Sequence, residues 1–563
     1  MGFVWGEEAL MPKLRISQPN KVICEIDANF GDTLLKAISD AGVYLDAPCG
    51  GEGRCGKCLV HVKAKTKSGA ENLTEVLACL AYVDGDMDVY LPGETVMKII
   101  GSSEEGLSQC KCNCEGKQER ECRRSCEIEK NAILGVAIDI GTTTVVARLI
   151  NLETGRRIGV ASGVNAQRVY GADVISRIKY CSTNGHEKLT KLIRVQIKEL
   201  IRQMLTEIVG LKSSEGLLEE NSLNENESIA KIENIVIAGN TIMQHLAAGY
   251  SPVSMGSVPF DTISLFGKTT PVWEELLELP ISPDAEMYYT PAIAAYVGGD
   301  VTAGVLAFET AFNFSPGGDK VKNTVLFLDI GTNGEIVLKH ENKYYCCATA
   351  AGPAFEGAEI EMGTAAVNGA ISHAAWNEER GELELTVIGE AAPIGICGSG
   401  LLDILAFLVE KNFVDETGRL EPEQDGLWSG AGNKDRFYIT KSVYITPEDV
   451  RKLQLAKAAI AAGIQTLLSY VNITEEQVDA LILAGGFGNF LDKKSAARIG
   501  LIPPSLLPVT HALGNTSLDG ATIALCNEHA REKLEDIRNR MEYVELSTSR
   551  LFNDQFIEQM MFW

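Results

Sequence analysis

The tetrapeptide Asp-Ile-Gly-Thr occurs twice, at residues 139–142 and at residues 329–332, each time at the end of an apolar run. A second run of strand-forming residues follows each copy, at 145–150 and at 335–339. This pattern predicts a strand that ends in a carboxylate, a tight turn of glycine and hydroxyl residues, and a returning strand. Two copies of such a hairpin predict a fold built from two similar halves.

The same order of elements continues after each hairpin. Residues 187–209 have the periodicity of an amphipathic helix, and a strand at 235–238 follows. In the second half a helix is expected at 449–471 and a strand at 481–484, followed by glycines. Hairpin tips rich in Gly and Thr present N–H and hydroxyl groups to phosphate oxygens, and a glycine pair after a strand allows a nucleotide to approach the backbone. Each half is therefore expected to bind part of a nucleotide.

A second motif consists of four cysteines near the N-terminus. Their spacing is C-x5-C-x2-C-x20-C, and they are Cys49, Cys55, Cys58 and Cys79. Four thiolates are the number that a [2Fe–2S] cluster requires, and the glycines between the first three allow a loop to wrap closely around it. A structural zinc site is the alternative, although zinc ribbons usually pair two C-x2-C units.

The sequence around these cysteines predicts a small mixed sheet with one helix. Strands are expected at 13–17, 21–27, 59–63 and 86–91, and a helix at 33–42. This arrangement resembles the β-grasp ferredoxins. The spacing of five residues between the first two cysteines resembles that of adrenodoxin-like ferredoxins, whereas plant-type ferredoxins have four residues there.

Length and composition limit the remaining choices. With 563 residues the chain is too long for one core, and we expect a ferredoxin domain at 1–92, a cysteine-rich linker at 93–133 and two nucleotide-binding halves at 134–322 and 323–563. The net charge of −25 argues against nucleic acid and anionic membranes as partners. Because neither a signal peptide nor a run of 18 apolar residues occurs, a cytoplasmic protein is expected.

The linker holds further cysteines, at positions 110, 112, 114, 122 and 126. Their spacing matches no metal site that we recognise. A second metal site and redox-active or incidental thiols both stay open as interpretations.

The two hairpins together with an Ala-Gly-Gly-Phe-Gly segment resemble the actin/Hsp70/sugar-kinase superfamily, in which two ribonuclease-H-like halves clamp ATP. The resemblance implies that Asp139 and Asp329 are catalytic, by holding Mg²⁺ and positioning the attacking water. The phosphate-binding residues that it implies are Gly141, Thr142, Thr143, Thr144, Gly331, Thr332, Asn333 and Gly334, with Gly485, Gly486 and Phe487 against the adenosine. Neither a Walker A motif nor a dinucleotide fingerprint is present.

Four further glycine-rich segments, at 237–243, 296–300, 348–357 and 395–400, together with the fused ferredoxin, resemble the reductive activators of corrinoid enzymes. That resemblance implies ATP-dependent reduction of a corrinoid from Co(II) to Co(I), with a corrinoid protein of a methyltransferase system as partner and an external electron donor. A homodimer is compatible with it. Plant-type clusters lie near −400 mV, and Co(I) is a stronger reductant, so ATP would drive an uphill transfer.

The sequence is also compatible with other functions. An ATP-driven donor to another enzyme, similar to the dehydratase activators, is one alternative, although those use a bridging four-iron cluster. A non-catalytic electron carrier or scaffold is a second, and a sugar kinase a third.

Asp300 and Glu356 lie in glycine-rich loops, where they could face the nucleotide or the partner, or cap helices. For His245 a structural role is favoured over cobalt ligation.

Overall fold

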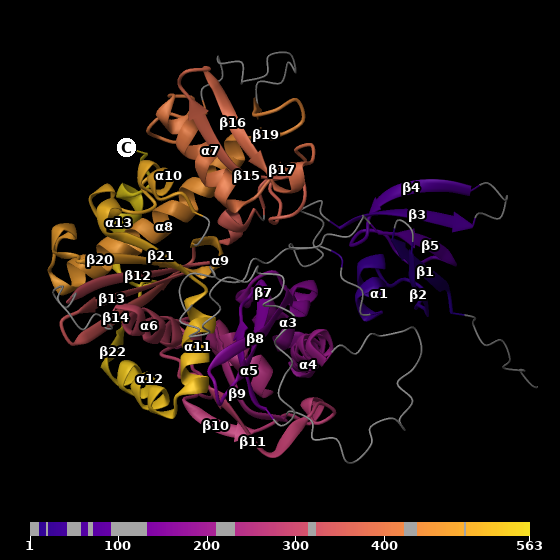
Figure 1. Ribbon diagram of the computed structural model, residues 1–563. Helices are drawn as coiled ribbons and strands as arrows, with labels where there is room; N and C mark the ends of the chain where they lie inside the picture. Colours follow the sequence, from indigo (N-terminus) through magenta and orange to yellow (C-terminus); the bar gives the residue numbers. More distant parts are fainter. Residues whose placement is uncertain are drawn as a thin grey trace, which may run out of the picture. The chain divides into compact units, whose positions relative to one another are not determined.

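The computed structural model describes residues 11–18, 21–41, 45, 58–65, 71–91, 132–209, 231–312, 323–357, 359–420, 436–488 and 491–562 (Figure 1). The chain divides into two compact units. Met1–Val96 and Ala166–Tyr180 belong to the smaller unit, and Met97–Asn165 and Cys181–Trp563 to the larger. Among the helices of the described ranges, none combines the length and apolar character needed to cross a bilayer.

The smaller unit contains a five-stranded mixed sheet with strand order β2-β1-β5-β3-β4. Its elements are β1 (Lys13–Gln18), β2 (Lys21–Asp27), α1 (Leu34–Asp40), β3 (Leu59–Lys65), β4 (Glu71–Leu77) and β5 (Met87–Tyr90). Strands β1 and β5 run parallel, and every other pair is antiparallel. Residues from α1 and from strands β1, β3 and β5 share one core, which also includes Cys58 and Cys79. The predicted β-grasp fold is confirmed.

The smaller unit also takes in Ala166–Tyr180, a segment that begins about 75 residues after β5. This segment comprises η1 (Ala166–Tyr170) and most of α3 (Val174–Asn184). Arg177 of α3 is fully buried, and its guanidinium donates to the carbonyl of Gly171 and to Gln167.

The larger unit begins with a six-stranded sheet of order β10-β11-β9-β6-β7-β8. Its strands are β6 (Ile133–Ile140), β7 (Thr144–Asn151), β8 (Arg156–Val164), β9 (Lys231–Gly239), β10 (Lys268–Pro271) and β11 (Ile281–Tyr289). The central strand β6 is apolar almost throughout and nearly all buried, as expected of a strand covered on both faces. Its helices are α4 (Glu187–Val209), α5 (Thr241–Ala248) and α6 (Gly299–Phe312).

The second sheet has the order β21-β20-β12-β13-β14-β22. Its strands are β12 (Thr324–Ile330), β13 (Gly334–His340), β14 (Lys343–Thr349), β20 (Ala480–Ala484), β21 (Thr510–Gly514) and β22 (Met541–Tyr543). The associated helices are α8 (Pro447–Val471), α9 (Gly485–Gly488), α10 (Lys493–Arg498), α11 (Thr516–Cys526), α12 (Glu528–Arg540) and α13 (Arg550–Glu558). Helix α8 begins in a capping box formed by Thr446 and Asp449, and it ends at Asn472 in the left-handed conformation.

The two sheets have the same plan over five strands. In the first, β11, β9 and β6 are parallel and β6, β7 and β8 form an antiparallel meander. In the second, β21, β20 and β12 are parallel and β12, β13 and β14 form the meander. The helices α4 and α8 occupy the same place in the chain order, between the meander and the next parallel strand. The predicted α/β fold is therefore confirmed, and the matching strand plans fit the two similar halves that the sequence predicts.

Helices α6 and α11 each follow the last parallel strand of their sheet, and they pack against one another (Figure 1). Helix α11 also packs on β6 and β9 of the first sheet. The approach is close, because a Cβ added at Gly520 would lie 1.9 Å from the carbonyl oxygen of Ala303. Buried Arg148 of β7 donates to Asp519 of α11 over 2.7 Å. One core cluster consequently includes residues of both sheets.

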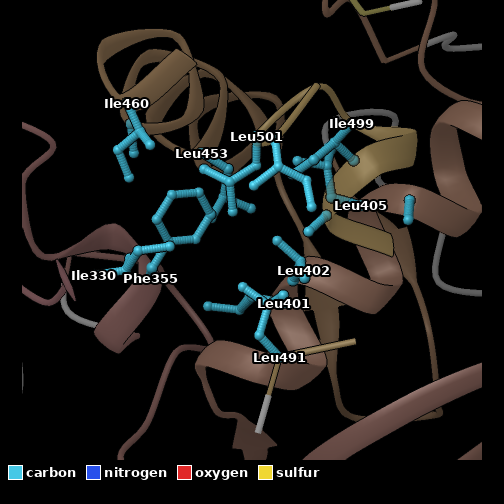
Figure 2. Packing of buried hydrophobic residues seen from close by; sticks show 14 of the residues in the cluster. Ile330, Phe355, Leu401, Leu402, Leu405, Leu453, Ile460, Leu491, Ile499 and Leu501 are labelled. Carbon is cyan, nitrogen blue, oxygen red and sulfur yellow. The ribbon is translucent and has the colours of Figure 1, made fainter. Parts of the chain in front are cut away.

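A second core lies within the C-terminal half, where an insertion between β14 and α8 adds a layer. The insertion contains η4 (Pro353–Glu356), β15 (Ala370–Asn377), β16 (Glu382–Val387), β17 (Gly395–Ile396), α7 (Gly398–Glu410), β18 (Phe437–Tyr438) and β19 (Tyr444–Ile445). Figure 2 shows the ring of Phe355 pointing into this core, among Leu402, Leu453 and Ile460. Phe355 therefore fixes η4 to the body of the C-terminal half.

The packing of α6 on α11 predicts that Gly520→Ala lowers the free energy of unfolding by about 1–3 kcal/mol, because the added methyl group must push two backbones apart. Denaturant unfolding of the full chain, followed by circular dichroism, measures this difference. Lys533→Ala, on the exposed side of the neighbouring helix α12, is the control and should stay within about 0.5 kcal/mol of the wild type. A Gly520→Ala variant as stable as this control would contradict the close approach.

Candidate functional site

The tips of the two central hairpins are tight turns closed by a backbone hydrogen bond. In the first, the N–H of Gly141 donates to the carbonyl of Thr144 over 2.9 Å, and in the second Gly331 donates to Asn333 over 2.9 Å. The second turn is one residue shorter, so that Asp329 pairs across the ladder with Glu335, whereas Asp139 pairs with Val146. The two loops are therefore similar, but only in the second does the aspartate lie opposite another carboxyl group, that of Glu335.

The two loops meet through their threonines. The hydroxyl oxygens of Thr143 and Thr332 lie 3.3 Å apart. Each hydroxyl also donates to the carboxylate of Glu356, Thr143 over 2.7 Å and Thr332 over 2.7 Å. The structure thus brings together two residues that the sequence predicted as phosphate-binding, and it adds a carboxylate that bridges them.

Asp139 is bound by the start of helix α11 from the other half. Asn515 donates to one carboxylate oxygen over 2.8 Å and Ser517 donates to the other over 2.8 Å. Asn515 also caps α11, since its side-chain oxygen accepts from the N–H of Leu518. The carboxylate at the end of β6 therefore ties the first sheet to the second half. No local sequence pattern predicts this contact.

Asp329 lies beside the glycine turn that follows β20. Gly485 has a φ of +87°, and a Cβ there would lie 2.6 Å from a carboxylate oxygen of Asp329. The close approach and the positive φ both require glycine at this position. A Cβ at Gly486 would meet nothing within 4 Å, so the turn is open on that side. The backbone of Phe487 belongs to the short helix α9.

Other residues that the sequence singled out have more local roles in the structure. The carbonyl of Thr144 closes the first turn, and the side chain of Asn333 hydrogen-bonds to Glu335. Gly334 lies against β14, because a Cβ there would be 2.7 Å from the hydroxyl of Thr349. Thr142 lies half-buried in the first turn.

Four carboxyl groups from both halves influence one another at this place. They belong to Asp139, Asp300, Asp329 and Glu335. Burial raises the pKa of Asp300 to about 8, with repulsion from Asp329 and Asp139 adding to the shift. Burial and repulsion from Asp139 raise the pKa of Asp329 to about 7. The pKa of Glu335 is raised well above its usual range by burial and by Asp300 and Asp329.

Two opposing effects act on the pKa of Asp139. Burial raises its pKa, and the hydrogen bonds from Asn515 and Ser517 oppose that shift. Such a concentration of perturbed carboxyl groups is typical of a functional site. Asp300, which the sequence predicted to face the nucleotide or the partner or to cap a helix, is part of it, and so is Glu335. The sequence signal for Asp300 is the preceding glycine pair, because a Cβ at Gly298 would lie 2.5 Å from the backbone nitrogen of Thr241.

The donor set suits Mg²⁺ in one respect, because it consists of carboxylate oxygens whose repulsion a dication would relieve. Within the described residues, however, no group of three or more His, Cys, Asp and Glu side chains is arranged to ligate a metal ion directly. An ion that arrives with the phosphates of a nucleotide, and keeps several of its waters, fits both observations.

In the smaller unit, two of the four predicted cluster ligands lie together. The sulfur atoms of Cys58 and Cys79 are 3.2 Å apart in a buried position, close enough to bind the same iron ion. Cys49 and Cys55 lie outside the described residues, as do the five linker cysteines. The thiol pair therefore fits the cluster that the spacing predicted.

His245 is a structural residue, as its sequence context favoured. It is fully buried in α5, its Nδ1 donates to the carbonyl of Thr241 over 2.7 Å, and its Nε2 accepts from the N–H of Ser264. Burial lowers the pKa of His245 to about 4. A neutral, enclosed imidazole with both nitrogens occupied does not present a ligand to an external cobalt ion.

The raised carboxyl pKa values predict how stability depends on pH in the nucleotide-free protein. Folded Asp300 keeps a proton that the unfolded chain releases near pH 4, so stability falls as pH rises from about 4 to about 8. Asp300→Asn removes this term and should melt higher than the wild type at pH 8 but not at pH 5. Thermal melting at both pH values measures it, with Asp284→Asn, exposed on β11, as control. Equal shifts at both pH values would contradict the assignment.

Comparisons with known proteins find similar domains along most of the chain. Three family descriptions match: a 2Fe-2S iron-sulfur cluster binding domain at residues 18–84, the RACo middle region at 134–311, and the C-terminal domain of RACo, the ASKHA domain, at 323–563. The 2Fe-2S match favours an iron–sulfur cluster over a zinc site.

Three similar proteins cover most of the chain. The corrinoid activation enzyme RamQ of Eubacterium limosum is 29% identical over 617 aligned positions, with 96% of this chain and 97% of the relative covered. The [Co(II) methylated amine-specific corrinoid protein] reductase of Methanosarcina barkeri is 25% identical, with 76% and 77% covered. A solved structure, a reductive activator for corrinoid, iron-sulfur protein, is 29% identical with a TM-score of 0.64, covering 98% of each chain. Along its length the chain therefore matches a 2Fe-2S domain, then the RACo middle region and then the C-terminal ASKHA domain of RACo.

Proposed function

We propose that this protein uses ATP to drive the transfer of one electron from a [2Fe–2S] cluster to the cobalt of a corrinoid protein, which converts Co(II) to Co(I). The observation that carries the proposal is the union, in one chain, of a buried thiol pair in a β-grasp unit with two facing phosphate loops in a two-sheet unit. The names of the relatives, a corrinoid activation enzyme and a Co(II) corrinoid protein reductase, support the same reaction.

In the ferredoxin unit, Cys49, Cys55, Cys58 and Cys79 would hold the cluster. When bound, the cluster supplies a one-electron carrier of low potential. The short separation of Cys58 and Cys79 and their burial support this ligand set. An external reductant must reload the carrier after each turnover, because every electron passed to cobalt leaves the protein oxidised by one electron.

In the nucleotide unit, the two hairpin tips would hold the phosphates of ATP between the halves. Thr143 and Thr332 are the main hydroxyl donors, because their side chains already face one another. Gly485 and Gly486 would lie along the nucleotide on the open side of their turn, with Phe487 in the same turn. Mg²⁺ would enter with the phosphates and offset the repulsion among the carboxyl groups.

The two predicted catalytic acids would have different tasks. Both oxygens of Asp139 accept hydrogen bonds from residues at the start of α11, so the hydrogen bonding of Asp139 would depend on the position of the other half. Asp329 is the better candidate for orienting water, because no side chain within the described parts of the chain hydrogen-bonds to its carboxylate. Its raised pKa would fall when a cation binds nearby, which favours the charged, water-orienting form.

The corrinoid partner would belong to a methyltransferase system, and the reaction would take place in the cytoplasm, where reducing conditions keep the cysteines available for the cluster. A homodimer remains a prediction, which the mass of the purified protein in solution checks.

The ligand assignment predicts that Cys58→Ser and Cys79→Ser each abolish the visible absorption of the cluster and lower the bound iron and sulfide, because a thiolate ligand is lost. Cys24→Ser, on strand β2 of the same unit, is the matched control and should keep the wild-type spectrum. Full iron and sulfide content in the Cys58 or Cys79 variant would contradict this ligand set.

The nucleotide assignment predicts that ATP turnover rises when a Co(II) corrinoid protein is added, and that Asp329→Ala lowers this stimulated rate by about a hundredfold or more while the cluster spectrum is unchanged. Phosphate release measures the turnover, with Asp284→Ala on the exposed part of β11 as control. Turnover that is independent of the corrinoid protein, or phosphorylation of a sugar, would count against the proposal.

A further inference from the structure

A single carboxylate joins the two phosphate loops. Glu356 accepts one hydrogen bond from Thr143 of the first half and one from Thr332 of the second, each over 2.7 Å and each on a different oxygen. Its carboxylate also covers the tip of the second loop, since a Cβ at Gly331 would lie 4.0 Å from it. Glu356 is half-buried, so this contact stays accessible from solvent.

The backbone around Glu356 is fixed, so the position of the carboxylate is built into the fold. The preceding Phe355 is buried in the core of the C-terminal half (Figure 2). The short helix η4 lies between two glycines with positive φ, Gly352 at +76° and Gly357 at +75°. A Cβ at Gly357 would lie 2.6 Å from the carbonyl oxygen of Thr364, so this turn has no room to shift.

The contact conflicts with phosphate binding by the same hydroxyls. A threonine hydroxyl has one proton to donate, and both threonines donate theirs to Glu356. The negative charge of the carboxylate also repels any phosphate oxygen that comes within hydrogen-bonding distance of the same two hydroxyls. A phosphate that reaches both hydroxyls must therefore take the place of the carboxylate.

We propose that Glu356 is a positioning residue that the terminal phosphate of ATP replaces. This inference rests on the proposed function. In the nucleotide-free protein the carboxylate holds the two loops together, and on ATP binding the terminal phosphate accepts the hydrogen bonds of Thr143 and Thr332 instead. ADP is one phosphate shorter and leaves the carboxylate in place. Glu356 thereby makes the separation of the loops depend on whether a triphosphate or a diphosphate is bound.

Titration calorimetry of the full chain with Mg-ATP and with Mg-ADP tests the exchange. Glu356→Gln removes the charge while keeping the size of the side chain, so ATP should bind about tenfold more tightly and ADP within about twofold of the wild type. Glu359→Gln is the matched control, because Glu359 is exposed and lies three residues further along the same segment. Its affinities for both nucleotides should be unchanged.

Glu356→Asp gives a second measurement should Glu356→Gln fail to fold. The shorter side chain cannot reach both hydroxyls, so its ATP affinity should again exceed that of the wild type. Hydrogen exchange at the hairpin tips should be faster than in the nucleotide-free wild type, and ATP should remove the difference.

Three results would overturn the inference. If the variants fold and the wild type binds ATP, but the ratio of ATP to ADP affinity is the same in all of them, Glu356 is not exchanged. Weaker ATP binding in Glu356→Gln would identify Glu356 as a direct part of the nucleotide site instead. Wild-type protein that binds no ATP would remove the proposed function itself, and this inference with it.

Discussion

The burial of four carboxyl groups close together is the constraint on which the larger unit depends. Asp139, Asp300, Asp329 and Glu335 come from β6, α6, β12 and β13, and burial raises the pKa of each of them. Repulsion from neighbouring carboxyl groups raises the pKa of Asp300, Asp329 and Glu335 further. A protein gains no stability by holding such groups together and away from water. A cation that binds together with a polyphosphate would offset the repulsion among these carboxyl groups.

The fold holds these groups in place by other means. Helices α6 and α11 pack at backbone distance, and the buried pair of Arg148 and Asp519 ties α11 to the first sheet. Asn515 and Ser517, at the start of α11, bind both oxygens of Asp139. Helix α11, which packs against both halves, therefore also begins with the residues that bind the carboxylate of Asp139.

Much of the fold could be predicted from the sequence, because it rests on local patterns. The helix expected at 187–209 is α4 with those bounds, and the central strands of both hairpins lie where their apolar runs predicted them. Strands β4 and β8 were not predicted, since neither residues 71–77 nor residues 156–164 form an apolar run. The β-grasp unit and the paired halves followed from the order of elements.

The candidate site could be predicted only in part. The loops were visible because a glycine turn after a strand is a local signal. The partners of these loops were not, since Asn515 lies 376 residues from Asp139 and Glu356 lies 213 residues from Thr143. Contacts over such separations depend on how the two sheets meet, which no local pattern encodes. The cysteine spacing, by contrast, is a local signal, and the close pair of Cys58 and Cys79 fits the ligand set that it predicts.

The central claim is that nucleotide between the halves makes an otherwise unfavourable electron transfer proceed. The most direct measurement mixes the chemically reduced protein with a Co(II) corrinoid protein, under strict exclusion of oxygen, and follows the absorption of Co(I). The account predicts Co(I) with ATP, and at most a trace with ADP or without nucleotide. Equal amounts of Co(I) in all three mixtures would contradict it.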